Sequence, residues 1–305
     1  VVTWSPGFGP RPFPSAAAYA MMAKTSALFV IMANLPSIFL AFGLYFVAGV
    51  LIAQHLARGM TLTAMTRRAI LGCGFAAAAL HAVVLYASLR RGAGFNLALT
   101  GMFSLVAWAV AVLFLIAALT KPIEVLGVVI LPIAGITLLV EWLWPGQVML
   151  RETAYGGLAR LHIVNSILAY SLLCIAAVQS LLLLYQERML HARQVGGLLR
   201  ALPPLQTMEH LMFQMLAVGF VLLTATLVSG VFFSDQVFGK PFKLTHHILL
   251  SAIGWAVFGV LLAGRRLYGW RGQTAVRFTL AGFTLLLLGY FGSKFVLEVL
   301  LRRSA

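Results

Sequence analysis

The fold is decided by residues 243–272, which read Lys243-Leu244-Thr245-His246-His247, then an apolar segment, then Gly264-Arg265-Arg266 and Gly269-Trp270-Arg271-Gly272. About 19 residues separate the histidine pair from the first arginine. A helix of that length, at about 1.5 Å per residue, is roughly 28 Å long and matches the hydrocarbon core of a bilayer. The segment therefore predicts a transmembrane helix with two imidazoles at one membrane face and arginines, including Arg277, at the other.

The composition of the whole chain favours a membrane protein. Of its 305 residues, 62% are hydrophobic and 10% are charged, with a mean hydropathy of +0.99. Soluble domains normally carry about 25% charged residues, so this chain has too little polar surface for a soluble globule. The net charge of +15 comes from short basic clusters between apolar runs. Such clusters indicate topology signals and contacts with membrane lipids, and they give no reason to expect a nucleic-acid partner.

Apolar runs along the sequence predict an all-α, polytopic bundle of eight transmembrane helices, because only helices satisfy their own backbone in lipid. A flexible N-terminal extension, residues 1–25, is expected to precede the transmembrane domain, residues 26–305; its first part is rich in proline and glycine. The predicted spans are 26–53, 69–89, 96–119, 124–144, 161–186, 209–233, 245–264 and 278–300.

The distribution of basic residues predicts the orientation. The loops after spans one, three, five and seven hold eleven lysines and arginines, and those after spans two, four and six hold six. The positive-inside rule then places both termini outside the cytoplasm, although Arg11, Lys24, Arg302 and Arg303 in the two tails reduce the difference.

Four histidines and two cysteines have places that limit their roles. His55, His191 and His210 fall in inner loops or at a helix start, where a solvated or interfacial side chain is expected. His81 lies inside the second span, where an ionisable group is costly. It either serves a function or packs against a serine or a carbonyl group. Cys73 and Cys174 lie inside spans, and no Cys-x-x-Cys motif occurs, which excludes disulfide exchange by this chain.

Three further histidines are predicted at the outer membrane face. His162 opens the fifth span on that side, and His246 and His247 open the seventh. Imidazoles that approach from two helices at one depth are able to hold haem iron between two axial nitrogens. Neighbours on a helix point about 100° apart, so only one of His246 and His247 faces a given partner. The alternative is that all three only anchor helix ends at the interface.

Polar side chains continue inward from this face. A stripe at helical spacing in the fifth span is expected to face protein or a cavity instead of lipid; it consists of His162, Asn165, Ser166 and Tyr170. In the eighth span, Lys294 stands one turn from Glu298, and its ammonium group has two candidate partners: that carboxylate and a haem propionate.

An ordered set of motifs resembles the cytochrome c assembly membrane proteins, the CcsA/CcmC-like group, and within it the branch of YpjD and HemX. The motifs are Leu161-His162 with Leu168-Ala169-Tyr170-Ser171-Leu172-Leu173, Thr245-His246-His247 with Trp255, Gly269-Trp270-Arg271-Gly272, and Gly282-Phe283 before Tyr290-Phe291-Gly292. The resemblance covers about residues 26–300. It implies a bacterial inner-membrane protein that binds or passes haem at its outer face, with His162 as the family's first outer-face histidine and other maturation proteins as partners.

The chain departs from the synthase branch of that group in three ways. The tryptophan-rich outer loop of the synthases is replaced by a stretch with Phe232, Phe233, Phe238 and Phe242. A second outer-face histidine after the last span has no counterpart, and Ala263 stands near the place of a buried histidine. We therefore expect an accessory haem-binding factor without the full synthase motif, and we leave open whether it is an enzyme.

Two other functions remain as alternatives. An ion-coupled permease would need His81, Glu141, Lys294 and Glu298 along one path, and a regulatory membrane partner would need none of these groups. The small residues Ser251, Gly254 and Gly259 predict that the seventh span packs centrally in the bundle, because they allow close approach of helices.

Overall fold

The computed structural model describes residues 16–60, 62–89, 94–96, 98–144, 149–151, 157–193, 201–238 and 246–296. Within them, eight helices are long and apolar enough to cross a membrane, so the predicted all-α bundle of eight spans is confirmed. The spanning elements are α1 (Ala16–Ala57), α2 (Ala64–Leu89), α3 (Leu99–Thr120), α4 (Gly127–Leu143), α5 (Gly157–His191), α7 (Leu205–Phe238), α8 (His246–Tyr268) and α9 (Gly272–Leu287). The short helix η1 (Glu124–Leu126) precedes α4.

The eighth span is one helix with a local change of winding. α9 continues through a π-helical turn, η3 (Leu288–Gly292), into α10 (Ser293–Phe295). It begins at Gly272, earlier than the predicted start at residue 278, because Arg277 lies within the helix and remains exposed. Long basic side chains reach the interface from within a span, which is why a charge alone marks a helix end poorly.

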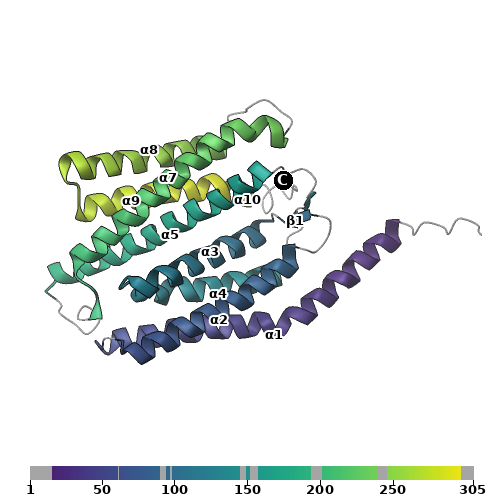
Figure 1. Cartoon of the computed structure of the whole chain (residues 1–305), viewed down its shortest axis with the longest axis horizontal. Coiled ribbons are helices and arrows are strands. Elements are labelled where there is room, and N and C mark those ends of the chain that lie inside the picture. Colours follow the sequence, from purple (N-terminus) through teal and green to yellow (C-terminus); the bar gives the residue numbers. More distant parts are fainter. Residues whose placement is uncertain are drawn as a thin grey trace, which may run out of the picture.

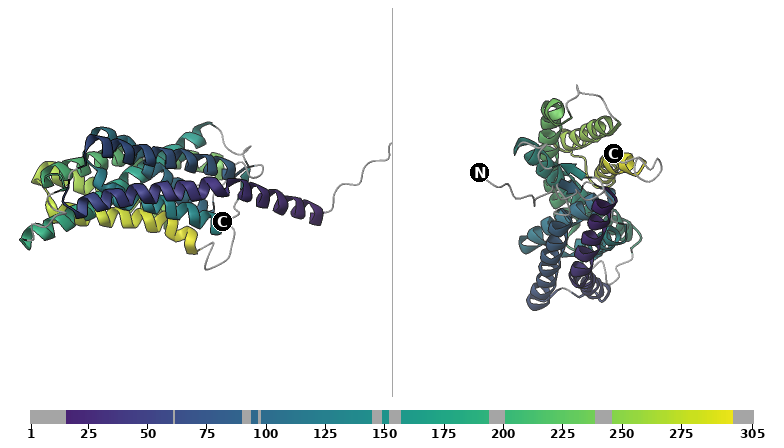
Figure 2. Two further views of the ribbon diagram at one scale, coloured as in Figure 1. Left: turned by 90° about the horizontal axis from the view of Figure 1, so that it is seen from below. Right: turned by 90° about the vertical axis from the view of Figure 1, so that its right-hand side faces the viewer.

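Helix α1 also begins earlier than expected. It starts at Ala16, inside the predicted flexible extension, and it extends past the other helices at one end (Figure 2). Residues 16–18 are all alanine, the strongest helix former, and no proline follows until Pro36. The part with the length and hydropathy of a membrane span is Leu35–Ala57.

The contacts between helices arrange the eight spans as two rings of four. In Figure 1, α1 to α4 lie in one half of the bundle and α5, α7, α8 and α9 in the other. In the first ring, α1 packs against α2 and α4, and α3 packs against the same two helices. In the second ring, α5 packs against α7 and α9, and α8 also packs against α7 and α9. Contacts between α3 and α5 join the rings. Consequently α5 and α8 lie on a diagonal of the second ring, and almost no direct contact joins them.

Aromatic side chains fill the seam between the rings. Phe103 of α3 stacks on Phe291 of η3 with ring centroids 4.0 Å apart. Tyr170 of α5 lies edge-on to Phe291 at 5.6 Å and also contacts Phe283 of α9 at 5.7 Å. Such pairs add to the burial of apolar surface, so this cluster fixes the π-turn against both α3 and α5.

At one end of the bundle, two loops pair through a short β-ribbon. β1 (Gly94–Asn96) and β2 (Met149–Arg151) run antiparallel, with Phe95 opposite Leu150. These strands belong to the loops after spans two and four, so the pairing puts both loops at the same end, as the alternation of spans requires. This end is called the ribbon end below.

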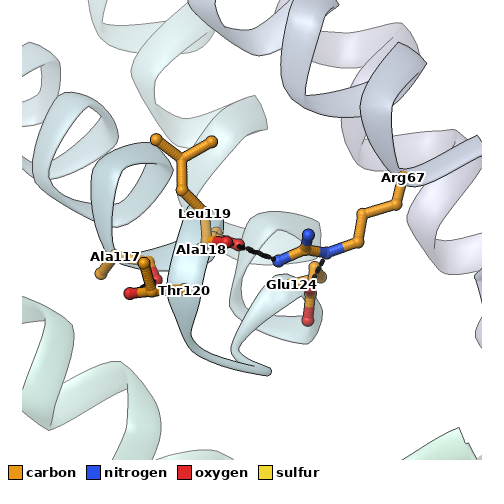
Figure 3. A network of polar contacts seen from close by, with 6 residues as sticks. All are labelled: Arg67, Ala117, Ala118, Leu119, Thr120 and Glu124. Atoms are coloured by element: carbon orange, nitrogen blue, oxygen red, sulfur yellow. Dashed lines mark hydrogen bonds and ion pairs between the residues drawn. The ribbon is translucent and has the colours of Figure 1, made fainter. Parts of the chain in front are cut away.

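The opposite end, called the arginine end, is tied by buried or half-buried ion pairs. Arg67 of α2 pairs with Glu124 of η1 and also donates to the carbonyl groups of Ala118 and Leu119 at the end of α3 (Figure 3). In the second ring, Glu209 of α7 accepts from Arg265 of α8 at 2.9 Å and lies 3.4 Å from Arg271. The loops after spans one and three, and those after five and seven, therefore meet at this end.

The prediction that the seventh span is central is wrong. α8 has the smallest buried share of the eight spans, 22%, and stands across the second ring from α5, the helix that joins the two rings. Its small residues do allow a close approach, since a Cβ atom on Gly254 would lie 3.1 Å from the carbonyl oxygen of Gly282 in α9. That approach joins α8 to one neighbour and does not place it in the middle of the molecule.

Candidate functional site

His162 lies in the first turns of α5 at the ribbon end. Its Nδ1 is 2.7 Å from the hydroxyl oxygen of Ser229 in α7. The Ser229 hydroxyl also lies 3.1 Å from the carbonyl oxygen of Thr226, to which it is able to donate. The contact between Nδ1 of His162 and Ser229 orients the imidazole ring, and the direction of the proton between them depends on the histidine tautomer. In the tautomer with its proton on Nδ1, the lone pair lies on Nε2, which is then the nitrogen suited to a metal.

Close packing against α7 also holds the His162 ring. A Cβ atom on Gly230 would lie 3.4 Å from Cε1 of His162, so the absence of a side chain there leaves room for the imidazole. Further along α5, the Asn165 amide donates to the carbonyl oxygen of Leu222 and to the Thr226 hydroxyl, both at 2.8 Å. The predicted polar stripe faces protein, which confirms that expectation for Asn165.

His246 and His247 are the first two residues of α8 and are both exposed. The face of α8 that packs on α9 and η3 includes Ser251, Gly254 and Phe258. His247 stands four, seven and eleven residues before these three, so it shares their face, and its carbonyl oxygen is 3.3 Å from the Cβ position of Gly289. His246 is rotated from it by about 100°.

The structure brings His162 and the histidine pair to one end of the second ring. α5 and α8 both begin at the ribbon end (Figure 1), and they occupy the diagonal of that ring. Among the described residues, no three side chains of His, Cys, Asp or Glu gather as a metal cluster. The arrangement thus offers histidines from two helices at one end of the ring instead of a compact protein cage.

Lys294 lies at the same end, on α10. Its Nζ is 5.8 Å from the centroid of the Tyr290 ring, and the side chain is half-buried. Tyr290 belongs to the π-turn η3, and Lys294 follows it. The turn η3 packs on the start of α8. Glu298, the carboxylate considered as a partner of Lys294, lies outside the described residues.

His81 is in the other ring, apart from these groups. It is fully buried in α2, where its Nε2 is 2.9 Å from the Ser104 hydroxyl oxygen of α3, and its ring is edge-on to Tyr45 of α1 at 6.0 Å. The structure therefore separates His81 and Glu141, in the first ring, from Lys294, in the second. They do not line one path, as the permease alternative requires.

Two residues that act on the site were not foreseen from the sequence. Ser229 orients His162 from 67 positions away, and Gly289 touches the start of α8 from another helix. Serine and glycine are common in membrane helices, where small residues allow close packing. Neither carries a local signal that distinguishes it from its neighbours, so only the tertiary contacts reveal these two.

The fold and this end of the second ring define a polytopic helical membrane protein with histidines from two helices at the same end of one ring. A sequence model described as "Cytochrome C assembly protein" matches residues 76–301, from within α2 to beyond α10. The chain belongs to this family, and membership gives it a role in cytochrome c assembly.

Three relatives illustrate the range of similarity. The inner membrane protein YpjD of Escherichia coli strain K12 is 32% identical over 222 residues, which cover 72% of this chain and 83% of that protein. Protein HemX of Brevibacillus brevis is 28% identical over 131 residues, 43% of this chain and 48% of that protein. The cytochrome c biogenesis protein CcsA of Gloeobacter violaceus is 25% identical over 103 residues, 34% of this chain and 30% of that protein.

Proposed function

We propose that this chain is a haem-binding accessory factor of cytochrome c assembly in the bacterial inner membrane. The observation that carries the proposal is the pair of imidazoles at the ribbon end, His162 on α5 and His247 on α8, from helices on the diagonal of one ring. In four-helix bundles, cofactor sites are built in the core from side chains on facing helices. Two neutral imidazoles are a preferred set of axial ligands for haem iron.

His162 and His247 are suited to bind haem iron, the group that the proposal requires. His162 presents Nε2, because Ser229 occupies Nδ1. Ligating histidines commonly use their other ring nitrogen in this way, and the bond keeps the ring in one orientation. His247 is the better second ligand of the adjacent pair, since it shares the face of α8 that packs within the ring, while His246 is rotated away from that face.

Lys294 supplies a charge suited to a haem propionate. It lies at the ribbon end of the eighth span, whose earlier parts α9 and η3 pack on α5 and α8. A half-buried ammonium group beside the Tyr290 ring is able to receive a carboxylate near the membrane interface. We therefore include Lys294 in the proposed site and leave His81 out of it, because His81 belongs to the first ring and bonds to Ser104.

The chain's own residues then bind and orient haem, which is the molecule handled and supplies the iron that the cytochrome later uses. This fits the accessory role expected from the reduced aromatic loop, and other maturation proteins are the partners we propose. The ribbon end faces the outside in this proposal, which follows the loop charges.

Absorption spectra of the purified protein test the proposal. We expect a Soret band of low-spin haem in the wild type and its loss or conversion to a high-spin form in His162→Ala and in His247→Ala. His246→Ala is the matched control, because it removes the adjacent imidazole from the same helix turn and should leave the band unchanged.

Three results would contradict the proposal. A wild-type protein that binds no added haem would remove the function itself. Equal loss of the band in His246→Ala and His247→Ala would instead show that the register of α8 does not select the ligand. Retention of a normal spectrum in His162→Ala would exclude His162 as an axial ligand.

A further inference from the structure

The first turns of α8 rest on the π-turn η3 at Gly289, which is buried. A Cβ atom at this position would lie 3.2 Å from Cβ of Leu250, 3.3 Å from the carbonyl oxygen of His247 and 3.5 Å from the Ser251 hydroxyl oxygen. Carbon atoms normally touch at about 3.5–4.0 Å, so an added methyl group would press on α8. The two nearest atoms are a backbone carbonyl oxygen and a Cβ bonded directly to the α8 backbone, so no rotation of a side chain moves them away; only the Ser251 hydroxyl is able to turn aside.

The π-turn itself is held in place by its surroundings. Ser293 donates to the carbonyl oxygens of Gly289 and Tyr290, at 2.8 and 2.9 Å. Phe291, the residue after Tyr290, is buried in the aromatic seam against Phe103 and Tyr170. π-turns are rare and often occur at functional sites. Here the turn is anchored to α3 and α5, so it gives the start of α8 a fixed surface to rest on.

We propose that Gly289 is a positioning residue that sets where the first turn of α8, and with it His247, lies relative to His162. The inference rests on the proposed haem site and adds to it the element that fixes the spacing of its two ligands. α5 and α8 have almost no contact with each other, so their separation depends on what lies between them. Binding sites need their groups held within about 0.5 Å of the productive geometry, which is the scale of the displacement that a methyl group at Gly289 would cause.

Gly289→Ala tests the proposal, with Gly292→Ala as the matched control. Both changes put alanine for glycine in the same π-turn, but a Cβ atom at Gly292 would meet only Leu288 of its own helix, at 3.5 and 3.7 Å. Haem titration should show binding weakened on the order of tenfold in Gly289→Ala, with a larger high-spin fraction, and no change in Gly292→Ala.

Hydrogen exchange in the haem-free protein gives a readout that does not depend on haem. Residues 248–251 should exchange faster in Gly289→Ala than in Gly292→Ala, while residues 258–262, further along α8, serve as the internal reference. Identical spectra and exchange in the two variants would overturn the proposal. Failure of Gly289→Ala alone to fold would also overturn it, because positioning predicts a folded chain with altered ligation. If the wild type binds no haem, the proposed function fails, and the exchange experiment still decides whether Gly289 positions α8.

Discussion

At the scale of single residues, His81 shows how one nitrogen of a buried imidazole finds a partner inside a membrane span, while its Nδ1 has none among the described residues. Its Nε2 and the Ser104 hydroxyl oxygen are 2.9 Å apart, and both side chains are fully buried. In lipid or in a packed bundle, a polar group without a partner loses the hydrogen bonds that water would supply. The pair therefore ties α2 to α3 in the middle of the first ring.

Ser104→Ala should lower the stability of the protein without changing its haem spectrum. The imidazole of His81 would lose this partner in a buried place, which costs about 1–3 kcal/mol. Thermal unfolding in detergent measures the effect. Ser180→Ala is the control, because Ser180 is equally buried but donates only to Ala177 in its own helix. A haem spectrum altered in Ser104→Ala, or in His81→Ala, would place His81 in the cofactor site and would contradict the division between the rings.

The sequence identified His81, His162 and the His246–His247 pair as candidates, but it could not choose among their roles. Depth in the membrane follows from hydropathy, because the period and length of the apolar runs are local properties. Hydrogen-bond partners are not local. Ser104 lies 23 positions from His81 and Ser229 lies 67 from His162, and both are ordinary small residues in apolar helices. The choice of His247 over His246 likewise needed the register of α8 against α9.

At the scale of elements, Arg67 is the clearest connection between helices. Its guanidinium group extends from α2 to the last carbonyl groups of α3 and to the Glu124 carboxylate of η1 (Figure 3). Carbonyl groups at the end of a helix lack partners within it, and a cation near them also interacts favourably with the helix dipole. One side chain thus joins three helices, α2, α3 and η1, at the arginine end.

Arg67→Ala should destabilise the first ring, whereas Arg68→Ala should not. Arg67 is partly exposed, with 33% of its side chain accessible, so solvent weakens the charge interaction and the expected loss is about 1–2 kcal/mol. Arg68 is exposed and adjacent in the sequence, which makes it a matched control. Thermal unfolding of both variants in the same detergent measures the difference. Equal transition temperatures would show that the Arg67 contacts contribute nothing.

The seam between α8 and α9 supplies a second test at this scale. Gly254→Leu should disrupt it, because the new side chain would begin 3.1 Å from the carbonyl oxygen of Gly282 and 3.2 Å from Leu286. Overpacking of this kind costs on the order of 3 kcal/mol. Ala256→Leu adds similar bulk to an exposed position of the same helix and should be tolerated. Similar yields and melting temperatures for the two variants would mean that α8 is not fixed by this contact.

α8 also shows a limit of prediction from sequence. Its small residues correctly indicated a close helix approach, but the inference of a central position was wrong. In a membrane, a side chain that faces lipid and one that faces another helix are both apolar, so hydropathy does not distinguish the edge of a bundle from its middle. Only the partners of α8, which are α7 and α9, place it at the edge.

At the scale of the molecule, the number of spans was predictable and their arrangement was not. Eight apolar runs gave eight helices. The division into two rings, the seam between α3 and α5, and the diagonal of α5 and α8 depend on pairings between distant helices. The division matters for function, because the proposed haem site then belongs to the second ring. The first ring packs around α3 and supports it against the aromatic seam.

The orientation of the whole molecule is the remaining prediction. Eleven basic residues lie in the loops and adjoining helix ends of the arginine end and six in those of the ribbon end, so the arginine end should face the cytoplasm. Pairing of Arg67, Arg265 and Arg271 with carboxylates does not weaken this argument, because acidic residues contribute little to the rule.

Single cysteines in a chain without Cys73 and Cys174 test the orientation through an impermeant thiol reagent. Gln236→Cys, in the last turn of α7 at the ribbon end, should react in intact cells. Tyr268→Cys, 76% exposed at the arginine end, should react only after the membrane is opened. The two sites control for each other, since they lie at opposite ends of the second ring. The reverse pattern would put His162 and His247 at the cytoplasmic face, and a haem site that serves maturation outside the cytoplasm would then be untenable, even if the purified protein binds haem.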